Sequence, residues 1–169
     1  EHPDWAIHID EREGVQSRNQ MVLDLSRDEV CEYVINAVSD ILANANIEYV
    51  KWDMNRQLTD MPRLGYNHEY TLGYYKIMSA ITEKFPNILF EGCSAGGGRF
   101  DAGVLAYMPQ IWTSDNSDAI ARLKMQYSTS MCYPVYSISS HVTASPNHQC
   151  GRVTSLKTRA DVAYCGTFG

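Results

Sequence analysis

The chain has 169 residues, of which 44% are hydrophobic and 20% are charged, a composition typical of an ordinary globular protein. Its net charge is −6 and the two signs are interleaved, so it lacks the basic stripe that characterises nucleic-acid-binding proteins. No apolar run approaches the roughly 18–20 residues that a membrane-spanning helix needs, and no signal peptide is visible. We therefore expect neither a nucleic-acid partner nor membrane insertion.

The chain begins with Glu1 rather than Met and ends in a stretch, Gly166 to Gly169, that is typical of the inside of a strand. We therefore expect it to be part of a longer protein. Its five cysteines include no C-x-x-C pair, which favours reduced thiols in a cytoplasmic protein over a disulfide framework or a zinc knuckle. The five histidines show no metal-ligand spacing, so no metal site is expected.

The first third of the chain predicts a strand, a helix and a second strand. Residues 21–25 are extended and apolar, and Ser26 with Glu29 has the pattern of a capping box at a helix start. Apolar positions then recur at helical spacing as far as residue 42, which predicts one buried helix face. The run at 47–53 is a predicted strand whose tip carries charged residues.

The remainder of the chain alternates between helices and short apolar strands. The predicted helices cover residues 68–84, 118–131 and 152–161, and the predicted strands cover residues 88–90, 110–114, 134–138 and 163–168. In the helix at 118–131, Ile120, Leu123 and Tyr127 lie on one side and form the expected apolar face.

Regular alternation of strands and helices predicts parallel βα units. About five such units carry polar residues where their strands end, which favours a (β/α)8 TIM barrel over an open doubly wound sheet. Eight units need roughly 250 residues, so this chain can hold only about the last five. The predicted fold is an α/β TIM barrel present as a fragment, with residues 1–169 forming the C-terminal portion of the barrel.

Two apolar strands end in a carboxylate that has a tryptophan close by. The first reads Lys51-Trp52-Asp53 and the second reads Trp112-Thr113-Ser114-Asp115. Such strand ends face the active site of a barrel, and a pair of carboxylates is the machinery of glycoside cleavage. Lys51 leaves the same strand face as Asp53, where its ammonium could bind a sugar hydroxyl. The alternative is a salt bridge at the surface of the protein.

Further motifs occur in order along the chain: Arg18-Asn19-Gln20, Cys93 to Asp101, Ser140-His141-Val142 and Pro146 to Gln149. Together with the two strand ends, they resemble glycoside hydrolase family 36, the melibiase-type retaining α-galactosidases. The resemblance covers essentially the whole chain. It implies hydrolysis of terminal α-galactosyl residues of melibiose- or raffinose-type oligosaccharides by double displacement, without a metal or an organic cofactor.

The resemblance gives the two carboxylates separate roles. Asp53 matches the catalytic nucleophile, which attacks the anomeric carbon and forms a glycosyl-enzyme intermediate. Asp115 matches the general acid/base, which protonates the departing oxygen and later deprotonates water. Asp118 is a rival for the second role, although a carboxylate at a helix start would also serve as a cap. We prefer Asp115 because it follows the strand directly.

The resemblance also implies substrate contacts by six residues: Arg18, Lys51, Asn55, Cys93, Gly96 and Trp112. Consecutive glycines after Cys93 permit close approach of the backbone to a ligand, and no Lys-Ser/Thr pair follows them as in a phosphate-binding loop. The alternatives are that Arg18 is an ordinary solvated arginine and that Cys93 is a nucleophile with a histidine partner. His141 either faces the site or orients a loop, and Trp52 should face away from Asp53.

The match to the family pattern is incomplete. The adjacent aspartate pair that grips the far hydroxyls of the sugar has no counterpart in this sequence, and the flanking β-domains are absent. We therefore expect this polypeptide alone to bind galactose poorly and to turn over little substrate. Alternatives within the family are a galactosyltransferase of the raffinose-synthase type and an α-N-acetylgalactosaminidase. A non-catalytic carbohydrate-binding barrel is the alternative from another class, and the parent protein is expected to be a homo-oligomer.

Overall fold

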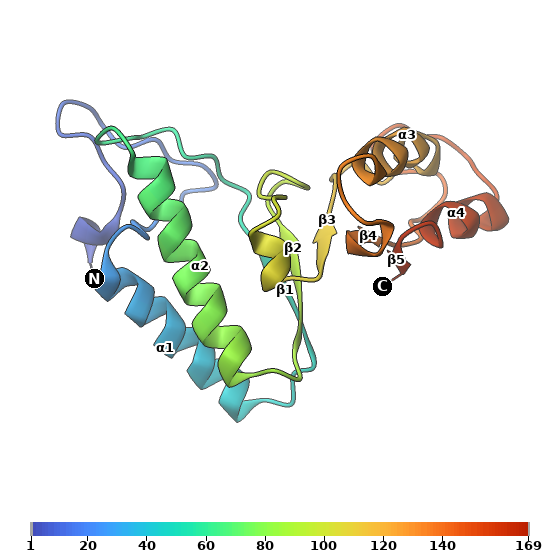
Figure 1. Cartoon of the computed structure of the whole chain (residues 1–169). Coiled ribbons are helices and arrows are strands. Elements are labelled where there is room, and N and C mark those ends of the chain that lie inside the picture. The colour runs from blue at the N-terminus through green and yellow to red at the C-terminus, as the bar shows by residue number, and fades with distance from the viewer. Residues whose placement is uncertain (1, 169) are drawn as a thin grey trace. The chain divides into compact units, whose positions relative to one another are not determined.

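The structure, a computed structural model, describes residues 2–168. The chain falls into two compact units (Figure 1), one comprising residues 1–48 and 56–88 and the other comprising residues 49–55 and 89–169. The first unit carries the two longest helices, and the second carries all the strands of the sheet.

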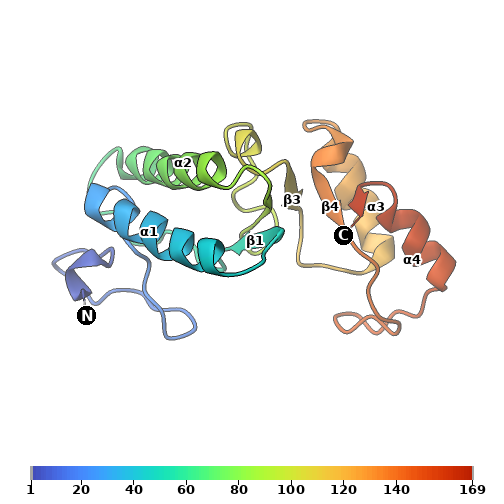
Figure 2. The same ribbon diagram turned by 90° about the horizontal axis from the view of Figure 1, so that it is seen from below.

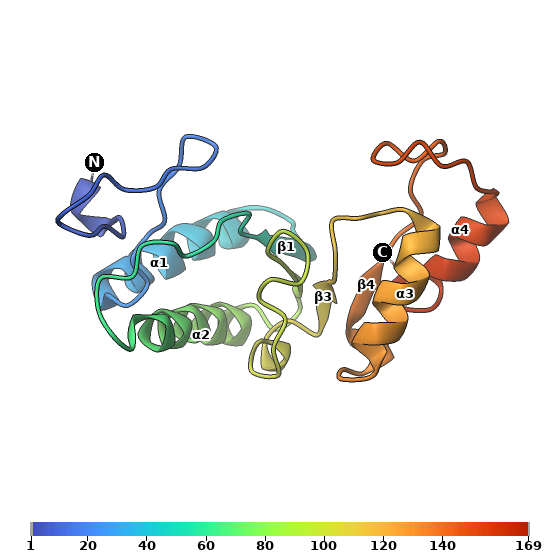
Figure 3. The same cartoon turned by 90° about the horizontal axis from the view of Figure 1, so that it is seen from above.

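Two long helices form the core of the first unit, α1 (Asp28–Asn44) and α2 (Tyr66–Lys84). They lie side by side in Figures 1 and 3, and the short 3-10 turn η1 (Pro3–Trp5) precedes them in the chain. The buried side chains of α2 recur at helical spacing and include Tyr66, Tyr70, Tyr74, Ile77, Met78 and Ile81. A Cβ on Gly73 would lie 1.8 Å from the carbonyl oxygen of Leu25, so this close approach requires glycine.

The segment at residues 21–25 does not form a strand of the sheet, so this prediction was wrong. Its Leu23 makes an antiparallel bridge with Ala6, and the Ile7 amide donates to the Val22 carbonyl. This apolar, extended segment therefore pairs with Ala6 and Ile7 within the first unit.

The predicted capping box at the start of α1 is also wrong. The amide and the hydroxyl of Ser26 both donate to Asp24 Oδ1, so the serine is committed to a turn before the helix. The N-cap position is taken by Arg27, whose guanidinium donates to the Glu29 carboxylate over 2.8 Å.

The second unit contains five parallel strands in one sheet, in the order β1-β2-β3-β4-β5. They are β1 (Tyr49–Asp53), β2 (Leu89–Cys93), β3 (Gln110–Trp112), β4 (Ile138–Ser140) and β5 (Thr167–Phe168). The order in the sheet follows the order in the chain, as in successive βα units of a barrel, whereas a doubly wound sheet reverses its order at a switch point. The predicted α/β class with parallel strands is therefore confirmed.

Some strand boundaries differ from the prediction. The strand expected at 134–138 begins later, because the 3-10 turn η3 (Val135–Ser137) precedes β4 and both the amide and the hydroxyl of Ser137 donate to the Pro134 carbonyl. The strand expected at 163–168 shrinks to β5, because the preceding helix α4 (Leu156–Ala163) continues to residue 163.

The helix α3 (Ala119–Ser130) lies beside α4 (Figure 2). It buries Arg122 and Gln126, whereas Ile120, Leu123 and Tyr127, the expected apolar face, are exposed. The expectation failed because the buried polar side chains satisfy backbone carbonyls. Arg122 donates to the carbonyls of Ser114 and Ser139, and Gln126 donates to that of Val162.

The short 3-10 turn η2 (Val104–Ala106) links the loop after β2 to β3, and Val104 in it is buried. Within residues 2–168, the helices are either too short or too polar to cross a lipid bilayer.

Candidate active site

Apart from Arg18, the residues expected to carry the chemistry lie at or near the carboxyl ends of the strands in the second unit. In the register of β1 and β2, Lys51 is paired with Glu91 and Asp53 is paired with Cys93. Because paired positions on adjacent strands share a face, all four side chains project from one face of the sheet. Trp52, between Lys51 and Asp53, projects from the opposite face, as predicted.

Asp53 lies at the tip of β1, exposed to solvent, and its carboxylate accepts a hydrogen bond from Asn55. The Asn55 side-chain amide donates to Oδ2 over 2.8 Å, and Cys93 is paired with Asp53 in the register of β1 and β2. Burial raises the pKa of Cys93 to about 11, and the charge of Asp53 adds to the effect. The thiol is therefore protonated at neutral pH, which disfavours its reading as a nucleophile.

The glycine-rich turn after β2 connects the tip of β1 with the tip of β3. At its start, the Ala95 amide donates to Asn55 Oδ1 over 3.1 Å. Gly96 then adopts a φ of +87°, and a Cβ there would lie 2.6 Å from the Cα of Ser114 and 3.1 Å from the amide nitrogen of Asp115. Only glycine permits this conformation and this approach. The turn thus joins the residue that holds Asp53 to the backbone that carries Asp115.

Asp115 follows β3 in a loop and its side chain is exposed. The Gln149 side chain fixes this loop, because its Nε2 donates to the Asp115 carbonyl over 2.8 Å and its Oε1 accepts from the Ser117 amide over 2.9 Å. Asn147 Nδ2 donates to Ser117 Oγ. Gln149 and Asn147 had no assigned role in the sequence analysis, and their place in the Pro146 to Gln149 motif was the signal that pointed to them.

Asp118, the rival for the general acid/base, is only 4% exposed and caps α3. Its Oδ2 accepts from the Ala121 amide over 3.0 Å, and Arg152 Nε lies 3.1 Å from its Oδ1. A carboxylate that is committed to a helix cap and an ion pair is poorly placed to exchange protons with a substrate. This arrangement supports Asp115 for that role.

Trp112 is 5% exposed, and its ring is covered by three side chains. The His141 ring stacks on it with 4.2 Å between centroids, Arg122 Cζ lies 4.4 Å from the centroid and Lys51 Nζ lies 4.7 Å from it. Burial lowers the pKa of His141, and the charges of Lys51 and Arg122 lower it further, so the imidazole is neutral at neutral pH. A contact of Trp112 with a sugar stays a prediction.

Glu91 is a buried carboxylate that the sequence analysis did not single out. It is 3% exposed and accepts hydrogen bonds from Tyr49, Gln110 and Ser139, while Lys51 Nζ lies 3.1 Å from its Oε1. The signal for it was its position in the apolar strand, two residues before Cys93 and therefore on the same face.

Arg18 belongs to the first unit, where it lies in a tight turn closed by backbone hydrogen bonds between Ser17 and Gln20. Arg18 and Asn19 have φ values of 54° and 58°, in the left-handed region. Arg18 is exposed. Its expected contact with the sugar stays a prediction.

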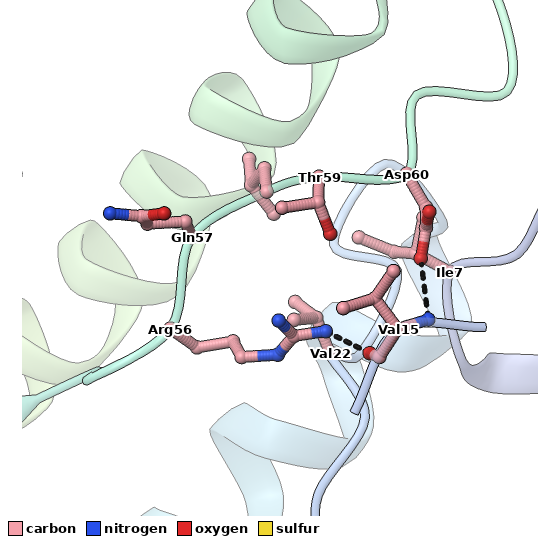
Figure 4. Close-up of a pocket in the computed structure, with 8 residues that line it drawn as sticks. Ile7, Val15, Val22, Arg56, Gln57, Thr59 and Asp60 are labelled. Atoms are coloured by element: carbon pink, nitrogen blue, oxygen red, sulfur yellow. Dashed lines mark hydrogen bonds between the residues drawn. The ribbon is translucent and has the colours of Figure 1, made fainter. Parts of the chain in front are cut away.

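The segment that precedes the turn at residues 17–20 lines part of a hollow in the first unit (Figure 4). Its lining includes Val15 and residues 56–60. The Val15 amide donates to Asp60 Oδ2 over 3.0 Å, and the Arg56 guanidinium donates to the Val15 carbonyl. The hydrogen bond from Val15, with the charge of Arg12, lowers the pKa of Asp60. The backbone at Val15 is therefore held by the ionised carboxylate of Asp60.

Across residues 2–168, no cluster of three or more histidine, cysteine, aspartate or glutamate side chains is arranged to hold a metal ion. The cysteines are free thiols, and those at positions 132, 150 and 165 are exposed.

A family model described as Melibiase matches residues 1–169. Among curated proteins, the chain is 54% identical to alpha-galactosidase AgaA of Geobacillus stearothermophilus, with 99% of the chain and 24% of AgaA covered. It is 52% identical to the bifunctional alpha-galactosidase/sucrose kinase AgaSK of Mediterraneibacter gnavus, over 99% of the chain and 18% of that protein.

Solved structures of the same two proteins are similar in fold. The galactosidase domain of AgaSK matches with a TM-score of 0.95 and 52% identity, over 99% of this chain and 23% of that chain. A variant of the GH36 enzyme AgaA in complex with stachyose and another in complex with raffinose each match with a TM-score of 0.94 and 54% identity, over 99% of this chain and 24% of theirs.

The chain spans about a quarter of the length of AgaA and less of AgaSK. The expectation of a partial barrel from glycoside hydrolase family 36 is thereby confirmed, since the match extends over the whole chain at about half identity. The parallel strands, the carboxylate-bearing strand tips and the family match together lead to one conclusion: the chain belongs to the melibiase family.

Proposed function

We propose that this segment contributes the two catalytic carboxylates of a retaining α-galactosidase. Asp53 attacks the anomeric carbon of a terminal α-galactosyl group and forms a glycosyl ester, while Asp115 gives its proton to the departing glycosidic oxygen. Asp115, now a carboxylate, then takes a proton from water, which attacks the ester, releases galactose and regenerates Asp53. Two inversions at the anomeric carbon give net retention.

One observation carries this proposal. The glycine-rich turn contacts Asn55, which donates to Asp53, and packs against the backbone of Ser114 and Asp115. The two carboxylates are 62 positions apart in the chain, yet one turn links their supports. Asn55 donates a hydrogen bond to the proposed nucleophile, and the carboxyl groups of both Asp53 and Asp115 are exposed.

The substrate class is proposed from the relatives. Variants of AgaA have been solved with raffinose and with stachyose. At about half identity, we expect the same class of α-galactosyl oligosaccharide here. Lys51, Asn55, Cys93, Gly96 and Trp112 would then contact or frame the sugar, and a contact by Arg18 remains an expectation from the resemblance.

The test replaces Asp53 by alanine in a full-length protein that contains this segment. Loss of the nucleophile should lower kcat for an α-galactoside by about 10³-fold or more, because no other carboxylate forms the ester. Steady-state hydrolysis of raffinose and of an aryl α-galactoside measures the change.

The matched control is Asp28→Ala, which removes an exposed aspartate that pairs with Lys76 on the helices of the first unit. It should leave kcat unchanged. An Asp53→Ala variant that is folded and retains near-parental kcat would remove Asp53 from the mechanism.

A further inference from the structure

Glu91 is the centre of a polar cluster that joins four strands. Tyr49 and Lys51 reach it from β1, Gln110 from β3 and Ser139 from β4. The Gln110 amide lies 3.0 Å and the Ser139 hydroxyl 2.8 Å from Oε2, whereas Lys51 Nζ lies 3.1 Å from Oε1. One oxygen therefore serves the neutral donors and the other serves the ammonium.

The carboxylate is ionised despite its burial. Burial alone would raise the pKa of Glu91, but the hydrogen bonds from Tyr49 and Ser139 and the charge of Lys51 outweigh it, so the pKa lies below its usual value. Burial and the neighbouring Glu91 raise the pKa of Tyr49, which therefore stays a donor. Burying an ion pair contributes little to stability on average, so this cluster calls for another reason.

That reason is the position of Lys51. A lysine carries a compact charge on a flexible four-carbon stem, so an unpaired Lys51 would sample several rotamers at the strand tip. Glu91 Oε1 and the Trp112 ring, 4.7 Å from Nζ, define one place for the ammonium. That place is on the sheet face that carries Asp53.

Glu91 itself does not reach the reacting atoms. It is 3% exposed, its carboxylate faces four donors, and it is paired in register with Lys51 rather than with Asp53. Any influence on the reaction must therefore pass through a neighbour, and Lys51 is the neighbour that is both charged and partly exposed.

We propose that Glu91 is a positioning residue, which holds the Lys51 ammonium in one pose so that it can bind a hydroxyl of the galactosyl group. This inference rests on the proposed function. Its consequence is a coupling between the two residues: Glu91 should matter to the kinetics only while Lys51 is present.

A double-mutant cycle in a full-length protein that contains this segment tests the coupling. Glu91→Gln keeps the size of the side chain and removes its charge. It should lower kcat/KM for an α-galactoside by about 10- to 100-fold, mainly through KM, because a misplaced contact carries losses of that order. In a Lys51→Met background, the same substitution should change kcat/KM by no more than about twofold.

Ser139→Ala provides a milder second variant, since it removes one hydrogen bond from Glu91 and leaves the ion pair. It should give a smaller loss of kcat/KM that also disappears in the Lys51→Met background, so the cycle can be read even if Glu91→Gln fails to fold. Asp28→Asn is the matched control: it removes an exposed carboxylate that lies 2.9 Å from the Lys76 ammonium, and it should leave KM unchanged.

The outcomes separate the two proposals. A full-length protein that does not hydrolyse α-galactosides contradicts the proposed function, whatever Glu91 does. An active parent in which the losses from Glu91 and Lys51 multiply contradicts the positioning role, because Glu91 would then act independently of Lys51. An active parent with an unchanged KM in both Glu91→Gln and Ser139→Ala contradicts it equally.

Discussion

The raised pKa of the Cys93 thiol can be tested directly by chemical labelling. The thiol is buried and in register with Asp53, and burial and the charge of Asp53 both raise its pKa. Alkylating reagents react with the thiolate, so a pKa of about 11 leaves a reactive fraction of about 10⁻³ at pH 8, against roughly a quarter for an ordinary thiol.

We therefore predict that iodoacetamide labels Cys93 at least about 100-fold more slowly at pH 8 than it labels the exposed Cys132. The rate should rise about tenfold per pH unit up to the pKa, since the thiolate fraction rises by that factor. Peptide mass spectrometry of the full-length protein measures both cysteines in one sample.

The control uses the charge of Asp53. Asp53→Asn removes a charge that raises the pKa of Cys93, so labelling of Cys93 at fixed pH should accelerate. Cys31 is buried in the first unit and should label at the same slow rate in both proteins. Equal rates for Cys93 and Cys132 in the parent would contradict the described environment of the thiol.

At the scale of the element, the glycine-rich turn carries the geometry that the carboxylate pair requires. Gly96→Ala would place a Cβ 2.6 Å from the Cα of Ser114 at a φ of +87°. We predict that it lowers the free energy of unfolding by more than about 1 kcal/mol, because both the conformation and the contact are unfavourable.

The same substitution should also displace Asp115 and lower kcat by about 10- to 100-fold, since a shift near 1 Å has effects of that order. Gly65→Ala is the matched control, because Gly65 has a φ of +81° but a Cβ there meets nothing within 4 Å. It should reduce the thermal unfolding temperature while kcat stays at the parental value. A Gly96→Ala protein with parental kcat would show that the turn does not position Asp115.

Hydrophobic periodicity correctly indicated buried residues in α2 but not in α3. In α2, apolar residues at helical spacing predicted a helix at 68–84, and Ile77, Met78 and Ile81 are buried. In α3, the same reasoning selected the exposed side of the helix. Arg122 and Gln126 are buried there because strand and helix carbonyls need donors, and a hydrophobic pattern does not register that need.

At the scale of the whole molecule, the order of strands and helices and the positions of both strand tips could be predicted from the sequence. Apolar runs that end in charged residues locate a strand end regardless of what surrounds it. The segment at 21–25 was wrongly predicted to be a strand of the sheet. Its Leu23 instead bridges Ala6, earlier in the chain, and local composition does not reveal such a partner.

The positions of the candidate site residues could be read from the sequence, whereas their roles stay predictions. Asp53, Cys93, Gly96 and Asp115 stand in the motifs that carry the resemblance. Glu91 instead makes buried contacts with three other strands, which only the register of the sheet brings together. The cytoplasmic location, the homo-oligomeric parent and the division into barrel and flanking domains stay predictions.

In the proposed mechanism, Asp53 becomes covalently attached to galactose. A fluorinated α-galactoside with a good leaving group slows breakdown of the ester, so the adduct should accumulate on the full-length protein. Proteolysis and tandem mass spectrometry then locate the fluorogalactosyl mass. We predict that it lies on Asp53, in the peptide that contains Lys51-Trp52-Asp53. An adduct on Asp115, Glu91 or any other carboxylate would contradict the role of Asp53 as the nucleophile, and so would turnover of the reagent with no adduct and an inverted product.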